Sequence, residues 1–169
     1  MWAACLPLRD GPLVPPPVSP MPDLQPHAGT YVLVLRSTQH AHCVVGRWGT
    51  LEIRPGYYLY VGSAFGAGGV RARVARHCRQ HKTQRWHIDY LRAFTAPHSV
   101  WCSYATTRLE HHWARALSAL PDVAAVDGFG CSDCRCDAHL FFAERAPRRA
   151  AFIAQVGGSV ETCRCQTAD

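Results

Sequence analysis

The amino-acid sequence predicts an α+β fold, with a small mixed or antiparallel sheet of three or slightly more strands flanked by helices. Two runs, residues 31–35 and 57–61, are apolar and rich in residue types that favour buried strands. The periodicity then changes, because Val70, Val74 and Cys78 recur every four residues and form one apolar stripe on a helix. Strands joined to helical segments in this way indicate helices packed against a sheet.

The remaining elements are expected in the following order along the chain. Residues 42–45 are expected to pair with the first strand as a hairpin, and a Pro-Gly turn leads into the strand at 57–61. Residues 70–79 form a helix, 86–91 a short helix and 99–105 a further strand. The clearest helix begins at Thr107 and stops at Pro121, and residues 139–142 are the last expected strand.

Composition divides the chain into three parts. Residues 1–28 hold eight of the twelve prolines, and proline removes backbone donors, so we expect a disordered or extended tail that could recruit a protein partner. With 48% hydrophobic and 18% charged residues the chain can build a core, and we assign one domain to residues 29–143. Residues 144–169 are expected to be an Ala/Arg- and Cys-containing tail.

Cysteine usage and hydropathy bear on the compartment. The nine cysteines are an odd number and no secretory signal is recognised before them, so we expect a cytoplasmic protein with reduced thiols. No stretch of 18 apolar residues exists, so no membrane span is expected.

Basic residues concentrate in one block of a chain whose net charge is +6. Between Gly68 and Arg92, seven Lys/Arg residues stand against a single acid, Asp89. Such a block attracts polyanions through phosphate neutralisation, although a solvated helix face is the alternative. We expect a nucleic acid as partner, contacted by Arg71, Arg76, Arg79, Lys82, Arg85 and His87.

Two short motifs stand at strand ends, Gly29-Thr30-Tyr31 and Tyr60-Val61-Gly62. Together with downstream Arg, His and Glu residues, this pattern resembles the GIY-YIG nucleases. The resemblance implies an endonuclease that depends on Mg²⁺ or Mn²⁺ and hydrolyses phosphodiester bonds in DNA. It implies these catalytic residues: Tyr31, Tyr60, Arg73, His77 and Glu110.

Three further runs, 56–64, 86–91 and 129–134, resemble one branch of that superfamily, the DUF123 proteins. Members of this branch resemble a domain attached to some endonuclease III-type proteins, which implies a role in DNA repair. Two departures from the wider family stand out. The 28 residues from 32 to 59 separate the two motifs, where about ten are usual, and no asparagine follows Glu110, so Ser132 or Asp133 would have to substitute.

The chemistry of these side chains suits phosphodiester hydrolysis. Arg73 offers a bidentate guanidinium to the phosphate, and Glu110 offers carboxylate oxygen to a Mg²⁺ ion. Tyr31 or Tyr60 would activate or orient the water, which requires a neighbouring arginine or metal to lower a pKa of about 10. His77, like His87, would relay a proton or contact phosphate.

Each of these residues also has an ordinary structural interpretation. Tyr31 and Tyr60 are equally typical of aromatics at the edge of a core, and Arg73 with His77 of a surface pair on one helix face. Thr107 and Glu110 have the spacing of a capping box, in which the glutamate would cap its own helix. The alternatives to a nuclease are therefore a non-catalytic nucleic-acid-binding module and a zinc-stabilised interaction domain.

The zinc alternative depends on a cysteine cluster near the end of the expected domain. The spacing C-x2-C-x-C-x2-H can wrap one tetrahedral Zn²⁺, and loop packing of the same residues is the alternative. The expected ligands are Cys131, Cys134, Cys136 and His139.

Overall fold

The computed structural model describes residues 23–79, 82–131 and 136–164. Its main element is a six-stranded sheet with the order β6-β7-β4-β1-β5-β8, in which every neighbouring pair is antiparallel. The strands are β1 (Gly29–Ser37), β4 (Gly56–Ala64), β5 (Ala96–Ser103), β6 (Ala124–Ala125), β7 (Leu140–Ala143) and β8 (Glu161–Arg164). The α+β prediction is confirmed, with a larger sheet than three strands.

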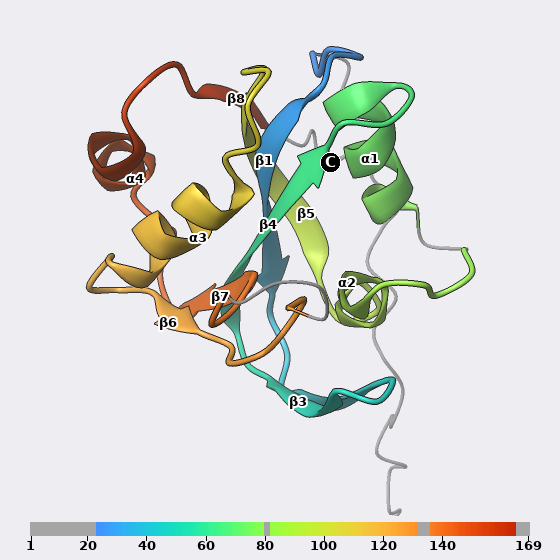
Figure 1. The fold of residues 1–169 in the computed structure, drawn as a ribbon. Helices are drawn as coiled ribbons and strands as arrows, with labels where there is room; N and C mark the ends of the chain where they lie inside the picture. The colour runs from blue at the N-terminus through green and yellow to red at the C-terminus, as the bar shows by residue number, and fades with distance from the viewer. Residues whose placement is uncertain (1–22, 80–81, 132–135, 165–169) are drawn as a thin grey trace, which may run out of the picture.

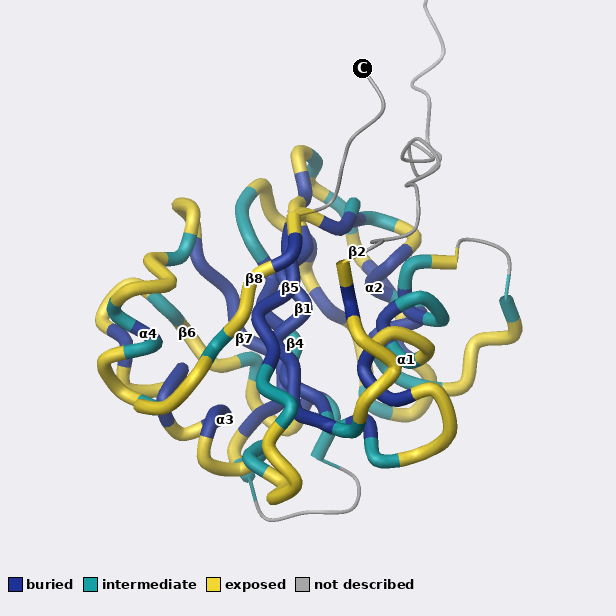
Figure 2. The backbone as a smooth tube through the Cα atoms, turned by 90° about the horizontal axis from the view of Figure 1, so that it is seen from above, coloured by how far each residue is buried: buried dark blue, intermediate teal, exposed yellow. Residues whose placement is uncertain are grey.

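Helices cover both faces of this sheet, as Figures 1 and 2 show. One face carries α1 (Gly69–Cys78) and α2 (His87–Leu91), and the other carries α3 (Glu110–Ser118) and α4 (Arg149–Val156). The central strand β1 is buried on both faces, which explains why its sequence is a continuous apolar run rather than an alternating one. Leu33 faces the core under α1 and α2, and Val34 faces the core under α3.

The predicted hairpin between the first strand and residues 42–45 is wrong. Residues 42–45 lie in β2 (Ala41–Val45), which pairs instead with β3 (Gly49–Ile53) in a separate two-stranded ribbon. Strand β1 pairs along its two edges with β4 and β5. Both of these strands, like β1, contribute side chains to the cores on the two faces of the sheet.

The helix expected from Thr107 begins later, at Glu110. Its N-cap residue is Leu109, with no side-chain cap, so the Thr107–Glu110 capping box is not formed. Instead, the Leu109 amide donates to Thr30 Oγ1 on β1 at 3.1 Å, and this long-range bond fixes where the helix starts.

The segment that we assigned to a C-terminal tail contributes to the core and to the sheet. Phe152 of α4 is fully buried, and its ring centroid lies 5.2 Å from those of Trp101 and Trp113. Strand β8 then pairs with β5 and extends the sheet. These residues are therefore continuous with the domain assigned to 29–143.

The last residues of the expected N-terminal tail pack on α1, whereas residues 1–22 lie outside the described residues. Leu24 is buried, and the carbonyls of His27 and Gln25 accept hydrogen bonds from the amides of Val70 and Arg71. The first amides of a helix have no partner within it, so this segment supplies acceptors for the start of α1. Within the described ranges, no helix combines the length and apolarity needed to cross a membrane.

Candidate active site

Tyr31 lies across a glycine on the neighbouring strand. The register of β1 and β4 pairs Tyr31 with Gly62, and a Cβ at Gly62 would lie only 2.4 Å from Tyr31 Oη. Because Gly62 has no side chain, the Tyr31 ring can lie across it. From there Tyr31 Oη makes a 2.8 Å hydrogen bond with His77 Nε2 on α1, which links the sheet to the basic helix.

Tyr60 and Trp86 complete an aromatic cluster around His77. The ring centroids of Tyr60 and His77 are 5.7 Å apart and those of His77 and Trp86 are 5.4 Å apart, both in edge-on geometry. Edge-on packing of this kind fixes ring orientation as well as burying apolar surface. The structure thus brings together Tyr31, Tyr60 and His77, which the sequence places on three separate elements.

Burial raises the pKa of both tyrosines, which is the opposite of the expected lowering. For Tyr31 the loss of hydration is the largest effect, and the charge of Arg73 opposes it without overcoming it. Burial likewise raises the pKa of Tyr60, helped by the negative charge of Glu110. Both side chains are therefore neutral hydroxyls at neutral pH.

His77 is neutral as well, since burial and then the charge of Lys82 lower its pKa to about 3. Its residue is only 1% exposed, and its Nδ1 atom has no hydrogen-bond partner among the described residues. A neutral imidazole has one donor and one acceptor nitrogen, so Nε2 can accept the Tyr31 proton when Nδ1 carries the ring proton.

Trp86 supports the guanidinium of Arg73, one of the predicted catalytic residues. Arg73 Cζ lies 4.6 Å from the centre of the Trp86 ring, and Arg76 Cζ lies 3.8 Å from the same ring. Such cation–π contacts hold a guanidinium in a defined plane. The sequence pattern alone gave no indication of this role for Trp86.

Asp89 is a second residue whose role the sequence analysis missed. Its buried carboxylate pairs with Lys82 Nζ at 2.9 Å and with Arg76 at 3.2 Å, and it accepts the backbone amides of Arg85 and Trp86. Burial would raise its pKa, but these donors lower it to about 2. The feature of the sequence that could have indicated this role is that Asp89 is the single acid among the seven basic residues between Gly68 and Arg92.

This arrangement divides the six residues expected to contact nucleic acid. Arg76 and Lys82 are paired with Asp89. His87 Nδ1 accepts the Gly130 amide at 3.2 Å, so it helps to hold the turn before β7. The remaining three side chains are exposed on or just after α1: Arg71, Arg79 and Arg85.

Glu110 stands at the start of α3, close enough to Tyr31 and Tyr60 for its negative charge to raise their pKa values. Its Oε1 lies 2.9 Å from His139 Nδ1, and its side chain remains 22% exposed. Burial would raise the pKa of Glu110, but His139 and then Ser63 lower it, so the carboxylate is ionised. The Ser63 hydroxyl is close enough to contribute to this effect, although the buried oxygen makes no hydrogen bond of good geometry with the described residues.

The expected zinc ligands are only partly described. Cys134 lies outside the described residues, and Nδ1 of His139 lies 2.9 Å from Glu110 Oε1. In the ranges that the structure covers, no three His, Cys, Asp or Glu side chains cluster in a way that could hold a metal ion. Zinc binding by this cluster stays a prediction.

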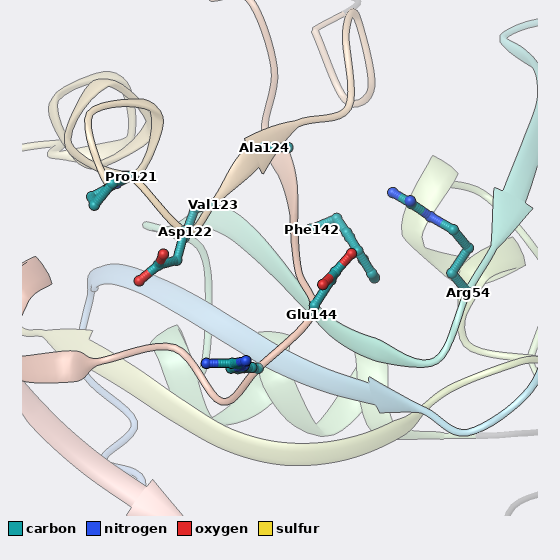
Figure 3. A pocket seen from close by; sticks show the side chains of 8 residues that line it. Arg54, Pro121, Asp122, Val123, Ala124, Phe142 and Glu144 are labelled. Carbon is teal, nitrogen blue, oxygen red and sulfur yellow. The ribbon is translucent and has the colours of Figure 1, made fainter.

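A cavity of about 430 Å³ lies away from the catalytic candidates, at the start of β4 and the end of β7 (Figure 3). Its lining mixes both charges, with Arg54 and Arg145 opposite Asp122 and Glu144. It contains none of the residues implied as catalytic, and its mixed charge does not favour an anion.

The comparisons with known proteins add the family. No curated protein and no solved structure matches this chain. One protein family does match, over residues 30–162, which takes in both tyrosines, the basic helix, α3, α4 and the beginning of β8. Because that match spans most of the chain, the protein belongs to the family described as the domain of unknown function DUF123.

Proposed function

We propose that this protein is a metal-dependent endonuclease that hydrolyses phosphodiester bonds in DNA by GIY-YIG-type chemistry. One observation carries the proposal. Tyr31, Tyr60, Arg73 and Glu110 come from four separate elements, yet each of the other three acts electrostatically on Tyr31. The pKa values of Tyr31, Tyr60 and Glu110 are shifted, and shifted groups from distant segments that act on one another are typical of catalytic sites.

Arg73 would bind the phosphate in this site. A guanidinium forms two parallel hydrogen bonds with phosphate oxygens, and stacking on Trp86 holds it ready for that geometry. The exposed arginines Arg71, Arg79 and Arg85, on α1 and in the segment between α1 and α2, would contact neighbouring phosphates.

Glu110 fits a divalent cation. Its carboxylate is ionised and partly exposed, and the buried Ser63 hydroxyl beside it offers another oxygen. Oxygen donors of this kind suit Mg²⁺ or Mn²⁺. When bound, the ion would offset negative charge on the phosphoryl oxygens.

Tyr31 and His77 would orient the attacking water. A neutral Tyr31 hydroxyl can accept a hydrogen bond from water while it donates a hydrogen bond to His77 Nε2. Since the pKa of His77 is lowered to about 3, its nitrogen is available as an acceptor throughout the neutral range. Tyr60 would orient the same water or the phosphate.

A second candidate is a module that binds nucleic acid without cutting it. The observation in its favour is the raised pKa of both tyrosines, because a neutral phenol is a weak base. This candidate keeps the roles of the exposed arginines and gives none to Glu110.

Nicking of supercoiled plasmid with Mg²⁺ or Mn²⁺ separates the two candidates. We expect the wild type to nick, and Arg73→Ala and Glu110→Gln each to lose at least about 100-fold in rate, the usual cost of removing one group that stabilises transition-state charge. Matched controls are Arg115→Ala and Glu52→Gln, which alter exposed residues elsewhere and should leave the rate unchanged. Folded wild type that retards DNA on a gel but never nicks it would refute the endonuclease and favour the binding module.

A further inference from the structure

The pair formed by Glu110 and His139 points to a role for a residue outside the implied catalytic set. We propose that His139 is a positioning residue, which fixes the Glu110 carboxylate so that it binds a divalent cation. The inference rests on the proposed function, because it assigns His139 to the same site.

The contact itself fixes the protonation of His139 at one nitrogen. Its Nδ1 lies 2.9 Å from Glu110 Oε1, and the two side chains are 5% and 22% exposed. An ionised carboxylate can only accept hydrogen bonds, so Nδ1 must carry the proton and donate it. Charge-assisted hydrogen bonds of this length are the stronger kind, and the partial burial reduces competition from water.

His139 is itself firmly held. Its amide donates to Phe129 O at 2.8 Å, and its carbonyl accepts the Val61 amide of β4 at 2.9 Å. A Cβ on Gly130 would lie 3.0 Å from His139 Cβ, so the glycine makes room for this close approach. The imidazole therefore starts from a backbone fixed to the strand that carries Tyr60.

Glu110 needs such a partner. It is the first residue of α3 and takes no part in a capping box, so nothing local to the helix orders its side chain. A free glutamate side chain loses rotamer entropy when it binds a metal, and a partner that orders it beforehand removes that cost from the binding step. Hydrogen-bonding partners of metal ligands typically change metal affinity 10- to 100-fold.

The position of the donor nitrogen can be tested by two substitutions of similar polarity. In His139→Asn the side-chain amide nitrogen takes roughly the place of Nδ1, whereas His139→Gln carries the amide one carbon further out. A structural role that only requires a polar side chain would not distinguish them, but a positioning role for Nδ1 would.

The probe is Mn²⁺ alone, with the free ion followed by electron paramagnetic resonance in solutions of the full chain. We expect His139→Gln to raise the Mn²⁺ dissociation constant about tenfold or more, and His139→Asn to stay within about threefold of wild type. The control is His42→Gln, which alters an exposed histidine on β2 and should leave the Mn²⁺ dissociation constant unchanged. Urea midpoints measured in parallel confirm that the variants compared are folded.

Two outcomes would overturn the inference, and they differ in what else they remove. Equal Mn²⁺ binding by the Asn and Gln variants, with binding still lost in Glu110→Gln, refutes the role of His139 and leaves the proposed function standing. Mn²⁺ binding that Glu110→Gln does not change refutes the cation role of Glu110, and the inference falls with it.

Discussion

Replacement of Asp89 by asparagine should destabilise the protein more than any surface charge change. The carboxylate is fully buried, and it receives one ion pair from Lys82, one from Arg76 and two backbone hydrogen bonds. These donors tie the C-terminal end of α1 to the start of α2, because Lys82 Nζ also donates to the carbonyls of Arg76 and His77. Removal of the charge would leave the Lys82 ammonium, only 9% exposed, without its counter-ion.

The magnitude follows from the pKa of Asp89. Its pKa falls from a usual value of 3.8 to about 2. Since a tenfold change in an ionisation constant is worth about 1.4 kcal/mol, the ionised form contributes roughly 2.5 kcal/mol to stability. A stranded buried cation raises the cost further, toward the ~3–5 kcal/mol typical of breaking a buried pair from one side. We expect Asp89→Asn to lower the free energy of unfolding by about 3 kcal/mol.

The sign of the pH dependence follows from the same values. The pKa of Asp89 is lower in the folded chain than in the unfolded chain, so its contribution is fully present above pH ~4. It is lost as the pH falls toward 2, because the unfolded chain takes up the proton first. The difference between wild type and Asp89→Asn should therefore shrink by about 1 kcal/mol at pH 3.

Urea denaturation at pH 7 and pH 3 measures both effects. The control is Asp122→Asn, which removes the pair between Asp122 and Arg148, both 73% exposed, and should cost under about 1 kcal/mol. An Asp89→Asn variant no less stable at pH 7 than Asp122→Asn would refute the reasoning.

Two further predictions concern packing. Gly62→Ala should lower the free energy of unfolding by about 1–3 kcal/mol and reduce the nicking rate at least about tenfold, because the new methyl would lie 2.4 Å from Tyr31 Oη. The control is Gly66→Ala, whose methyl would meet nothing within 4 Å. Equal urea midpoints and nicking rates for the two variants would contradict the prediction. Phe152→Ala should lower the free energy of unfolding in urea by about 3–5 kcal/mol, because the fully buried ring packs in the core under α3. The control is Gln155→Ala, which alters an exposed residue of α4 and should change the stability little. A small loss for Phe152→Ala would show that α4 does not stabilise the domain.

The elements that the sequence predicted correctly are those with strong local periodicity. The apolar runs at 31–35 and 57–61 lie in β1 and β4, and the stripe of Val70, Val74 and Cys78 lies on α1. Pairing was not predictable in the same way, because it depends on contacts between distant segments. Strand β8 gave no local signal at all, since three of its four residues are exposed and only Cys163 is buried.

The candidate site shows the same division. Motif spacing predicted Tyr31, Tyr60 and Glu110 as site residues, and in the folded chain Tyr60 and Glu110 both raise the pKa of Tyr31. The partner of Glu110 was not predictable, because the cysteines that precede His139 in the sequence suggested a metal site of their own. Only the antiparallel pairing of β7 with β4 carries His139 to the start of α3.

Burial of the tyrosines restricts what the proposed reaction can be. Because loss of hydration raises the pKa of Tyr31, a phenolate that forms in advance and waits for substrate is disfavoured. A neutral Tyr31 hydroxyl can instead accept a hydrogen bond from the attacking water while it donates one to His77 Nε2, and it thereby orients the water without a buried charge forming on either side chain. Burial is therefore the common cause of the neutral Tyr31 hydroxyl and of the neutral His77 imidazole to which it is hydrogen-bonded.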